Sequence, residues 1–383
     1  MTPIYLDYHA TTPADPRVVE AMLPWFTARF GNPHSTHAFG REAAAAVESA
    51  RASVAALLGA DPREIVFTSG ATEANNLAIK GAFTFLAEET EEKRNGIVTL
   101  VTEHKCVLES CARLKKAGAR VSVLPVRADG LVDLDLLAQA ITSETALVSV
   151  MAVNNEIGVV QPLAAIGALC RERGVLFHTD AAQAAGRIAL DVEAMAIDLL
   201  SISAHKMYGP KGVGALYVRR RPRVRLLPLI DGGGQERGLR SGTLPVPLCV
   251  GLGEAAGIAM REREAETARL LALRRRLFER LAEALPGIRL NGSEAARVAG
   301  NLNLAVPGLP AEALMAACPS LAFSTGSACT AAEVEPSYVL RALGIGDDLA
   351  RSSIRLGLGR FTTEDEAERA AAEIIRAVLQ IAR

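Results

Sequence analysis

Short apolar runs alternate with amphipathic stretches through the middle of the chain. The apolar runs predict strands that are buried on both faces, because few polar residues interrupt them. The amphipathic stretches predict helices, and this alternation favours a mostly parallel sheet covered on both faces. The predicted strands are 97–101, 121–124, 147–150, 175–177, 199–202 and 213–218, and the predicted helices between the earlier ones are 107–117, 134–141 and 163–173.

The pattern changes after the last of these strands. Residues 251–285, rich in Glu, Arg, Ala and Leu, predict one long charged helix, and residues 363–382 predict a closing helix with Thr363 as its N-cap. We therefore expect a large α/β domain over 13–260 and a smaller α/β domain formed by 1–12 and 261–383. The shorter predicted elements of the second domain are 301–306, 311–317, 337–342 and 353–358.

Composition and charge fit a globular protein. The 383 residues suffice for two domains, 50% of them are hydrophobic and the formal net charge is -1, which indicates neither a nucleic-acid nor a membrane partner. No stretch has the length and apolarity of a membrane span, and the N-terminus lacks the features of a signal peptide. The six cysteines form no CxxC pair or zinc spacing. We expect free thiols and a cytoplasmic location.

Lys206 is the first candidate for chemistry. The predicted strand 199–202 leads into Ser203-Ala204-His205-Lys206, and a loop rich in Gly and Pro follows. A lysine held at a strand end can attach its amine to pyridoxal phosphate (PLP), while neighbouring hydroxyl and imidazole groups bind the cofactor phosphate. A solvated loop lysine is the alternative, and the motif alone does not decide between the two.

Asp180 strengthens the first interpretation. It ends the apolar run that begins at Val175, and ligands of open α/β sheets bind at the carboxyl ends of strands. A carboxylate there can hold the protonated pyridine nitrogen of PLP, which makes the ring an electron sink. Taken alone, Asp180 could equally be a helix N-cap. Its occurrence together with the Ser-x-His-Lys segment favours the cofactor.

Three further polar segments follow predicted strands. The turn from Thr68 to Thr72 opens a helix whose free N–H groups suit a phosphate, although simple capping would explain it as well. His104 could stack on the cofactor ring or move protons, or be a structural histidine. Asn155 could bond the cofactor's ring oxygen, or belong to an ordinary polar turn. Each signal is weak by itself.

Together these motifs resemble the NifS/IscS-type cysteine desulfurases, PLP-dependent enzymes of the class V aminotransferase-like group, over nearly the whole chain. The resemblance implies PLP-dependent transferase fold type I, with a large mostly parallel sheet domain, and a homodimer. The matching segments are Tyr5-Leu6-Asp7-Tyr8, Gly70-Ala71-Thr72-Glu73, Thr102-Glu103-His104, Asn154-Asn155-Glu156, Asp180 with Gln183, Ser203-Ala204-His205-Lys206, Gly232-Gly233-Gly234-Gln235-Glu236-Arg237, Arg240-Ser241-Gly242-Thr243 and Gly359-Arg360-Phe361-Thr362.

The resemblance also implies a role for each matched residue. Lys206 would carry PLP, Asp180 would bind the ring nitrogen, and His104 would stack on the ring and share proton transfer. Gln183 and Asn155 would bind the ring oxygen, and Asn155 would also contact the substrate. The expected phosphate ligands are Ala71, Thr72, Ser203 and His205, with Thr243 supplied by the neighbouring subunit.

Two residues near the C-terminal end complete the predicted site. Arg355, in Ser353-Ile354-Arg355-Leu356, can grip a substrate carboxylate bidentately, with a surface ion pair as the alternative. Cys329 lies in a run of small residues, where an accessible thiolate can act as a nucleophile and an idle surface thiol is the alternative. The resemblance implies that Cys329 is the catalytic cysteine, on a mobile loop of the small domain, and a transient iron–sulfur ligand.

The implied reaction converts L-cysteine to L-alanine and leaves the sulfur as a persulfide on Cys329, for a sulfur-acceptor or iron–sulfur scaffold protein. Another PLP enzyme of the same fold, such as an aminotransferase or a selenocysteine lyase, is one rival; a catalytically silent sulfur carrier is another. The chain departs from the family at His9 and Phe323, which are expected not to touch the chemistry, and in its short C-terminus, which leaves the acceptor open.

Overall fold

The computed structural model describes residues 3–90, 93–325 and 335–381. Its largest element is a seven-stranded sheet in which only β8 runs against its neighbours, so the prediction of a mostly parallel sheet is confirmed. In spatial order the strands are β2 (Ile65–Thr68), β8 (Gly214–Val218), β7 (Leu199–Ser203), β6 (Leu176–Asp180), β5 (Thr145–Ser149), β3 (Gly96–Leu100) and β4 (Arg120–Leu124).

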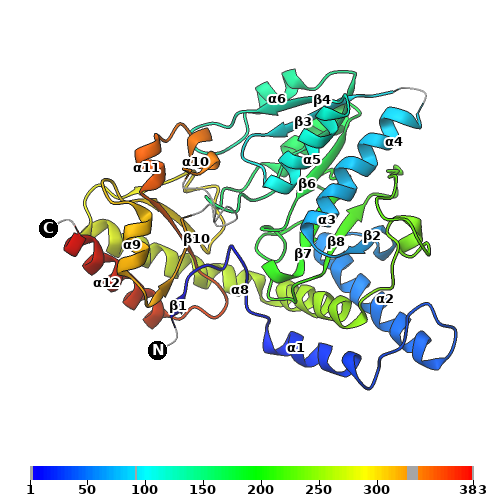
Figure 1. The fold of residues 1–383 in the computed structure, drawn as a ribbon, viewed down its shortest axis with the longest axis horizontal. Helices are drawn as coiled ribbons and strands as arrows, with labels where there is room; N and C mark the ends of the chain where they lie inside the picture. Colours follow the sequence, from blue (N-terminus) through cyan, green and yellow to red (C-terminus); the bar gives the residue numbers. More distant parts are fainter. Residues whose placement is uncertain (1–2, 91–92, 326–334, 382–383) are drawn as a thin grey trace.

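Helices cover both faces of this sheet (Figure 1). Neighbouring residues of β2 show the two faces, since Val66 packs on one side of the sheet and Phe67 on the other, as the alternation of side chains along a strand requires. The helical elements up to β8 are α1 (Pro16–Met22), η1 (Leu23–Phe26), α2 (Ala38–Leu58), η2 (Pro62–Glu64), α3 (Ala71–Asn76), η3 (Leu77–Gly81), α4 (Ala82–Glu88), α5 (Lys105–Lys116), α6 (Leu134–Ala140), α7 (Leu163–Glu172) and η4 (Ala204–Lys206).

A second hydrophobic cluster lies around the smaller sheets at the left of Figure 1. The elements here are β1 (Ile4–Tyr5) paired with β11 (Leu321–Ala322), the sheet of β12 (Ser353–Gly357), β10 (Asn301–Ala305) and β9 (Arg289–Leu290), and the helices α9 (Ala311–Ala317), α10 (Tyr338–Ala342), α11 (Asp347–Arg351) and α12 (Glu364–Ile381). Thr363 caps α12 as predicted, because its Oγ1 accepts from the Glu366 N–H at 3.2 Å.

The long helix α8 (Val246–Ala284) follows η5 (Glu236–Gly238) and connects the two regions. Its 39 residues extend about 58 Å at 1.5 Å per residue, so one helix reaches both hydrophobic clusters. Ala259 packs in the cluster of the large sheet and Leu270 in the second cluster. The expected boundary near residue 260 falls between them, and the division into two domains remains a prediction.

The N-terminal segment passes from one region to the other. Ile4 and Leu6 pack in the second cluster, and Asp7 forms a bridge with Gly357 of β12. A few residues later, Thr12 N–H donates to the carbonyl of His205 beside the large sheet, at 3.0 Å. This segment therefore brings its polar residues between the two hydrophobic clusters.

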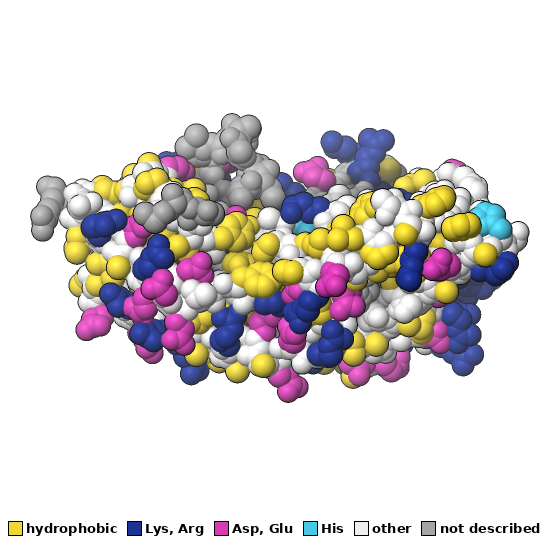
Figure 2. Space-filling view, turned by 90° about the horizontal axis from the view of Figure 1, so that it is seen from below, with side chains coloured by type: hydrophobic (Ala, Val, Ile, Leu, Met, Phe, Trp, Pro, Cys, Tyr) yellow, Lys and Arg dark blue, Asp and Glu magenta, His cyan; other side chains and the backbone are white. Residues whose placement is uncertain are grey.

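Two observations bear on the expected partners. On the face in Figure 2, basic and acidic side chains are interspersed with hydrophobic ones, in keeping with the net charge of -1. No helix within the described ranges is both long and apolar enough to span a bilayer.

Candidate active site

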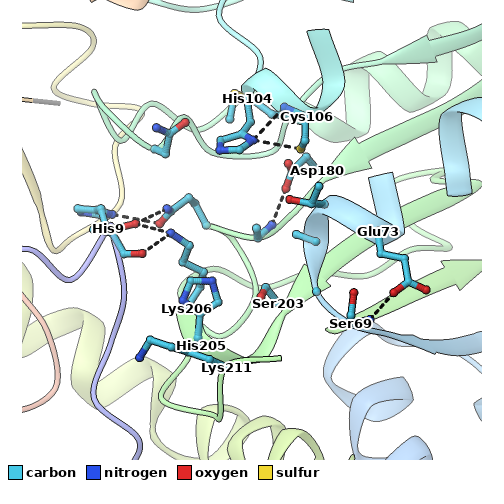
Figure 3. Close-up of a pocket in the computed structure, with 18 of the residues that line it drawn as sticks. His9, Ser69, Glu73, His104, Cys106, Asp180, Ser203, His205, Lys206 and Lys211 are labelled. Atoms are coloured by element: carbon cyan, nitrogen blue, oxygen red, sulfur yellow. Dashed lines mark hydrogen bonds between the residues drawn. The ribbon is translucent and has the colours of Figure 1, made fainter. Parts of the chain in front are cut away.

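A cavity of about 520 Å³ lies beside the ends of β6 and β7 and the start of α3, a size usual for a small-molecule site (Figure 3). It gathers residues from distant parts of the sequence, as expected where several strands of an open sheet end together. Its lining consists of His9, Ala10, Ser69, Gly70, Ala71, Thr72, Glu73, His104, Cys106, Met151, Asn155, Asp180, Ala182, Gln183, Ser203, His205, Lys206, Lys211, Gly212 and Arg355.

Lys206 reaches this cavity from η4, the short helical turn that follows β7. Its Nζ donates to the carbonyl oxygens of His9 and Ala10, each at 2.7 Å. These two carbonyl oxygens hold the amine at the cavity. An amine held in this way is placed to react with a carbonyl compound once it loses its proton.

One end of the cavity is rich in groups that can bind a phosphate. The turn between β2 and α3 has its sharpest point at Gly70, whose φ of 151° is a backbone conformation that other residues rarely adopt. Close packing adds to this constraint, since a Cβ on Gly214 would lie 2.7 Å from the Cα of Gly70. The turn therefore lies directly against the large sheet, and Ala71, Thr72 and Ser203 line the cavity there.

His205 belongs to the same end. Its Nδ1 lies 3.1 Å from Thr11 Oγ1, and burial together with Lys206 and Lys211 lowers its pKa to about 4. The imidazole is therefore neutral near pH 7 and carries only one N–H donor. The positive charge at this end comes from Lys211 instead, which also lines the cavity.

Asp180 and His104 are joined by a hydrogen-bonded chain at another wall, and Figure 3 shows the contact between His104 and Cys106 at one end of it. Asn75 Nδ2 donates to Asp180 Oδ2 at 2.7 Å and lies 3.2 Å from Cys106 Sγ, which in turn lies 3.0 Å from His104 Nδ1. The N–H of Ala182 donates to the other oxygen of Asp180 at 2.9 Å. The buried carboxylate is thus fixed by two donors, and the histidine ring is anchored at the helix start.

Arg355 forms the remaining polar wall. Its Nη2 donates to Asp7 Oδ1 at 2.7 Å and its Nη1 to the carbonyl of Asn155 at 2.9 Å. Its Nε is buried with no hydrogen-bond partner among the described residues, and so is Oδ1 of Asn155. A buried polar atom without a partner is costly, so an unsatisfied donor and acceptor at one cavity indicate a ligand-binding surface.

Glu156 lies behind this wall. It is buried, and Ser337 Oγ donates to its Oε2 at 2.5 Å. Burial raises the pKa of Glu156 to about 7, against opposing effects of the Ser337 hydrogen bond and the Arg355 charge. The region around Arg355 therefore contains two acidic side chains, Asp7 and Glu156.

The structure brings most of the predicted site together. Every predicted residue lines the cavity except Thr243 and Cys329. Thr243 is exposed, and its predicted role concerns the neighbouring subunit's site. Cys329 lies outside the described residues, although Ser324, five positions earlier, pairs with Arg355 through a β-bridge. No group of three or more metal-ligating side chains occurs in the parts of the chain that the structure describes.

Other residues at the cavity were missed or misjudged from the sequence. His9, which was expected not to touch the chemistry, lines the cavity, and its carbonyl accepts a hydrogen bond from Lys206 Nζ. Cys106 also lines it, although the sequence analysis gave no role to any cysteine other than Cys329. The first-turn position of Cys106, two residues after His104, was the available signal. Asp7 had no signal beyond its place in the Tyr-Leu-Asp-Tyr motif.

A lysine, a carboxylate and an arginine around one cavity at the edge of a mostly parallel sheet define a class of lysine-dependent α/β enzymes. The family model "Aminotransferase class-V" matches residues 4–370. The chain belongs to this family. The predicted fold type and the resemblance to NifS/IscS-type proteins are confirmed by the comparisons that follow.

The chain is 58% identical to "Cysteine desulfurase IscS" of Rickettsia rickettsii (strain Iowa), over 96% of this chain and 88% of that protein. The same identity and coverage hold for the protein of that name from Rickettsia felis. Among solved structures, a "NIFS-LIKE PROTEIN" is 35% identical with a TM-score of 0.91, covering 99% of this chain and 100% of its own. "SspA in complex with cysteine" is 40% identical with a TM-score of 0.82, covering 94% and 99%.

Proposed function

We propose that the protein is a PLP-dependent cysteine desulfurase, which converts L-cysteine to L-alanine and transfers the sulfur to its own Cys329. The observation that carries this proposal is the placement of Lys206, Asp180 and Arg355 around one cavity. The names of the similar Rickettsia proteins support it, and so does the solved SspA complex with cysteine.

The cavity residues fit PLP in charge and hydrogen bonding. Lys206 would carry the cofactor, and Asp180 would bind its pyridine nitrogen. The orphaned Oδ1 of Asn155 and the Gln183 amide offer polar contacts for the ring substituents, and the phosphate would lie against Ala71, Thr72, Ser203 and His205. When bound, PLP supplies an electron sink that accepts the bonding electrons of the substrate's α-carbon.

Arg355 and Asn155 would orient the substrate. The unsatisfied Nε of Arg355 is a donor that a substrate carboxylate would meet, together with the second N–H of an Nη group, because Asp7 and the Asn155 carbonyl each take only one N–H. Holding the carboxylate fixes the direction of the Cα–H bond relative to the cavity. Lys206, released from its covalent role, and His104 would then move the proton at Cα.

Cys329 would take the sulfur. Its thiolate attacks the sulfur of L-cysteine, a new S–S bond forms, and the C–S bond of the substrate breaks. The carbon skeleton gains a proton at Cβ and leaves as L-alanine. One thiol and L-cysteine therefore give one enzyme persulfide and L-alanine, and no external oxidant is needed.

The remaining parts of the proposal concern organisation and partners. Residues 13–260 would form a PLP-binding domain, and 1–12 with 261–383 a small domain that carries Cys329. The enzyme would work in the cytoplasm as a homodimer, with Thr243 serving the neighbouring subunit's cofactor phosphate. A sulfur-acceptor or iron–sulfur scaffold protein would receive the persulfide sulfur, with Cys329 as a transient cluster ligand.

A cysteine-substitution pair tests this function. Cys329→Ala should keep the absorption band of bound PLP but lose L-alanine and sulfide production from L-cysteine, with a reductant present, by about two orders of magnitude. Cys318→Ala is the matched control, because this thiol is buried in the second hydrophobic cluster and should leave turnover near wild type. Full sulfide release by Cys329→Ala would contradict the nucleophile assignment.

A further inference from the structure

Arg187 is a cation whose hydrogen-bond acceptors are all neutral. Its Nη1 donates to Gln183 Oε1 at 2.6 Å and lies 2.7 Å from His9 Nδ1, and its Nη2 donates to the carbonyls of Tyr8 and Lys206 at 2.8 and 3.3 Å. Within the described ranges no carboxylate lies within salt-bridge distance of it. Part of the residue is exposed, but burial of the guanidinium lowers its pKa.

The charged groups around Arg187 do not neutralise it locally. Glu266 and Tyr208 raise the pKa of Arg187 against the effect of burial, but Glu266 accepts its hydrogen bonds from Tyr208 Oη at 3.1 Å and Arg360 Nε at 2.9 Å and forms no ion pair with Arg187. Two other cations, Lys206 and Arg355, lie on the cavity side, and Arg355 further lowers the Arg187 pKa. Arg187 does not itself line the cavity, but two of its contacts, Gln183 and His9, do. A buried positive charge is stabilised by an anion in its neighbourhood, and an anion in the cavity would lie behind these two side chains.

The contacts of Arg187 determine which way the Gln183 amide faces. A guanidinium has only donors, so the Gln183 atom at 2.6 Å must be the oxygen. The other end is therefore the NH₂ group, which donates to the carbonyl of His9 at 2.8 Å and has a second N–H left. Since Gln183 lines the cavity, it presents a donor there and not an acceptor.

The contact with Arg187 also determines which ring nitrogen of His9 carries the proton. Its Nδ1 accepts from Arg187, which leaves the proton on Nε2, 3.4 Å from the carbonyl of Gly300. Burial and the Arg187 charge hold the pKa of His9 well below its usual range, so the ring stays neutral. Gln183 Oε1 and His9 Nδ1 are 3.2 Å apart because they share one donor nitrogen. Arg187 therefore fixes the oxygen end of the Gln183 amide, and the carbonyl of His9 holds the NH₂ end.

We propose that Arg187 is a positioning residue that turns the Gln183 N–H toward the ring oxygen of bound PLP and, through its charge, favours that oxygen as an anion. This inference rests on the proposed function, because it needs PLP in the cavity. Arg187 touches neither cofactor nor substrate in this account. It acts through Gln183 and through its electrostatic field across a short, poorly solvated distance.

A spectrophotometric pH titration of the PLP-loaded protein, without substrate, tests the proposal. The protonated form of the lysine-bound cofactor carries one more positive charge than the deprotonated form, so a nearby cation lowers the midpoint. Arg187→Met should therefore raise the midpoint by about one pH unit, a roughly tenfold change in proton affinity. Arg187→Lys keeps the charge and should raise it far less.

Control variants show whether a shift in the midpoint depends on the location of Arg187 or only on the loss of a buried arginine. Arg274→Met removes another buried arginine, which lies in α8, donates to the carbonyl of Val298 and does not line the cavity, and this variant should titrate like wild type. If Arg187→Met does not fold, Arg187→Gln removes the charge in a polar side chain and is held to the same shift. If these neutral variants keep the wild-type midpoint, the role of Arg187 is overturned and the proposed function is not affected. If the wild-type protein shows no PLP band, the proposed function is overturned as well.

Discussion

Arg355 lines the cavity and Arg187 contacts two residues that line it, but the positive charges of the two arginines are balanced differently. Arg355 is paired with Asp7 and has Glu156 nearby, and its Nε remains unsatisfied. Arg187 meets four neutral acceptors and no carboxylate among the described residues. A paired arginine can bind an incoming carboxylate with its spare donor at little electrostatic cost. An unpaired one instead biases the charge state of whatever lies beside it.

Removing Arg355 should give the largest effect on turnover. Arg355→Ala deletes the donor proposed to bind the substrate carboxylate and leaves Asp7 without its cation. We expect kcat/KM for L-cysteine to fall by about a hundredfold or more, in line with 2–5 kcal/mol for truncating a buried charge pair. The absorption band of bound PLP should persist. Steady-state kinetics with a PLP spectrum would check this, and an unchanged kcat/KM would contradict the substrate role.

Glu156, which lies near Arg355, should make the stability of the folded protein depend on pH. Its folded-state pKa of about 7 lies above the ordinary carboxyl value of 4.5, so the folded protein binds more protons in this interval. The free energy of unfolding should therefore fall as pH rises from about 4.5 to about 7. Glu156→Gln should remove roughly 2 kcal/mol of that decrease between pH 5.5 and 8.

Denaturant unfolding at these two pH values measures the difference. An identical pH dependence in wild type and Glu156→Gln would show that the carboxyl is not held protonated by burial. Glu335→Gln is a suitable control, because its side chain is exposed.

Replacing Asp7 should also weaken the reaction with L-cysteine, but less than replacing Arg355 does. Asp7→Asn keeps an acceptor for Arg355 Nη2 and removes the charge, so the guanidinium becomes less firmly oriented. We expect KM for L-cysteine to rise about tenfold with little change in kcat, as for an interaction that acts equally on bound substrate and transition state. A drop in kcat with constant KM would place Asp7 in the chemical step instead.

The smallest expected effect lies away from both arginines. Thr363→Ala removes the N-cap of α12 and should cost about 1 kcal/mol of unfolding free energy. Turnover per folded molecule should not change. Thermal unfolding followed by circular dichroism gives the stability, and altered kinetics would mean that the small-sheet region communicates with the cavity.

The sequence predicted those parts of the site that have a local signature. Asp180 and Lys206 each follow an apolar strand, and the carboxyl ends of parallel strands meet at one edge, so their proximity could be inferred. The mostly parallel sheet followed from the same runs. The reversed direction of β8 did not, because an apolar strand carries no mark of its direction.

The contacts of the two arginines could not be predicted in this way. Asp7 and Arg355 are 348 positions apart, and only the pairing of the N-terminal segment with β12 brings them together. Arg187 follows Gly186 in an irregular segment and reads as an ordinary surface residue. Its meaning depends on the orientation of Gln183, which is a property of the hydrogen-bond network and not of residue spacing.

Borohydride reduction of the PLP-loaded protein, followed by peptide mass spectrometry, tests the central claim most directly. Reduction fixes the cofactor on the lysine that carries it. The account predicts the phosphopyridoxyl mass on the peptide containing Lys206, and its loss in Lys206→Ala. A label on Lys211, the other lysine of the cavity lining, or no label at all, would contradict the account.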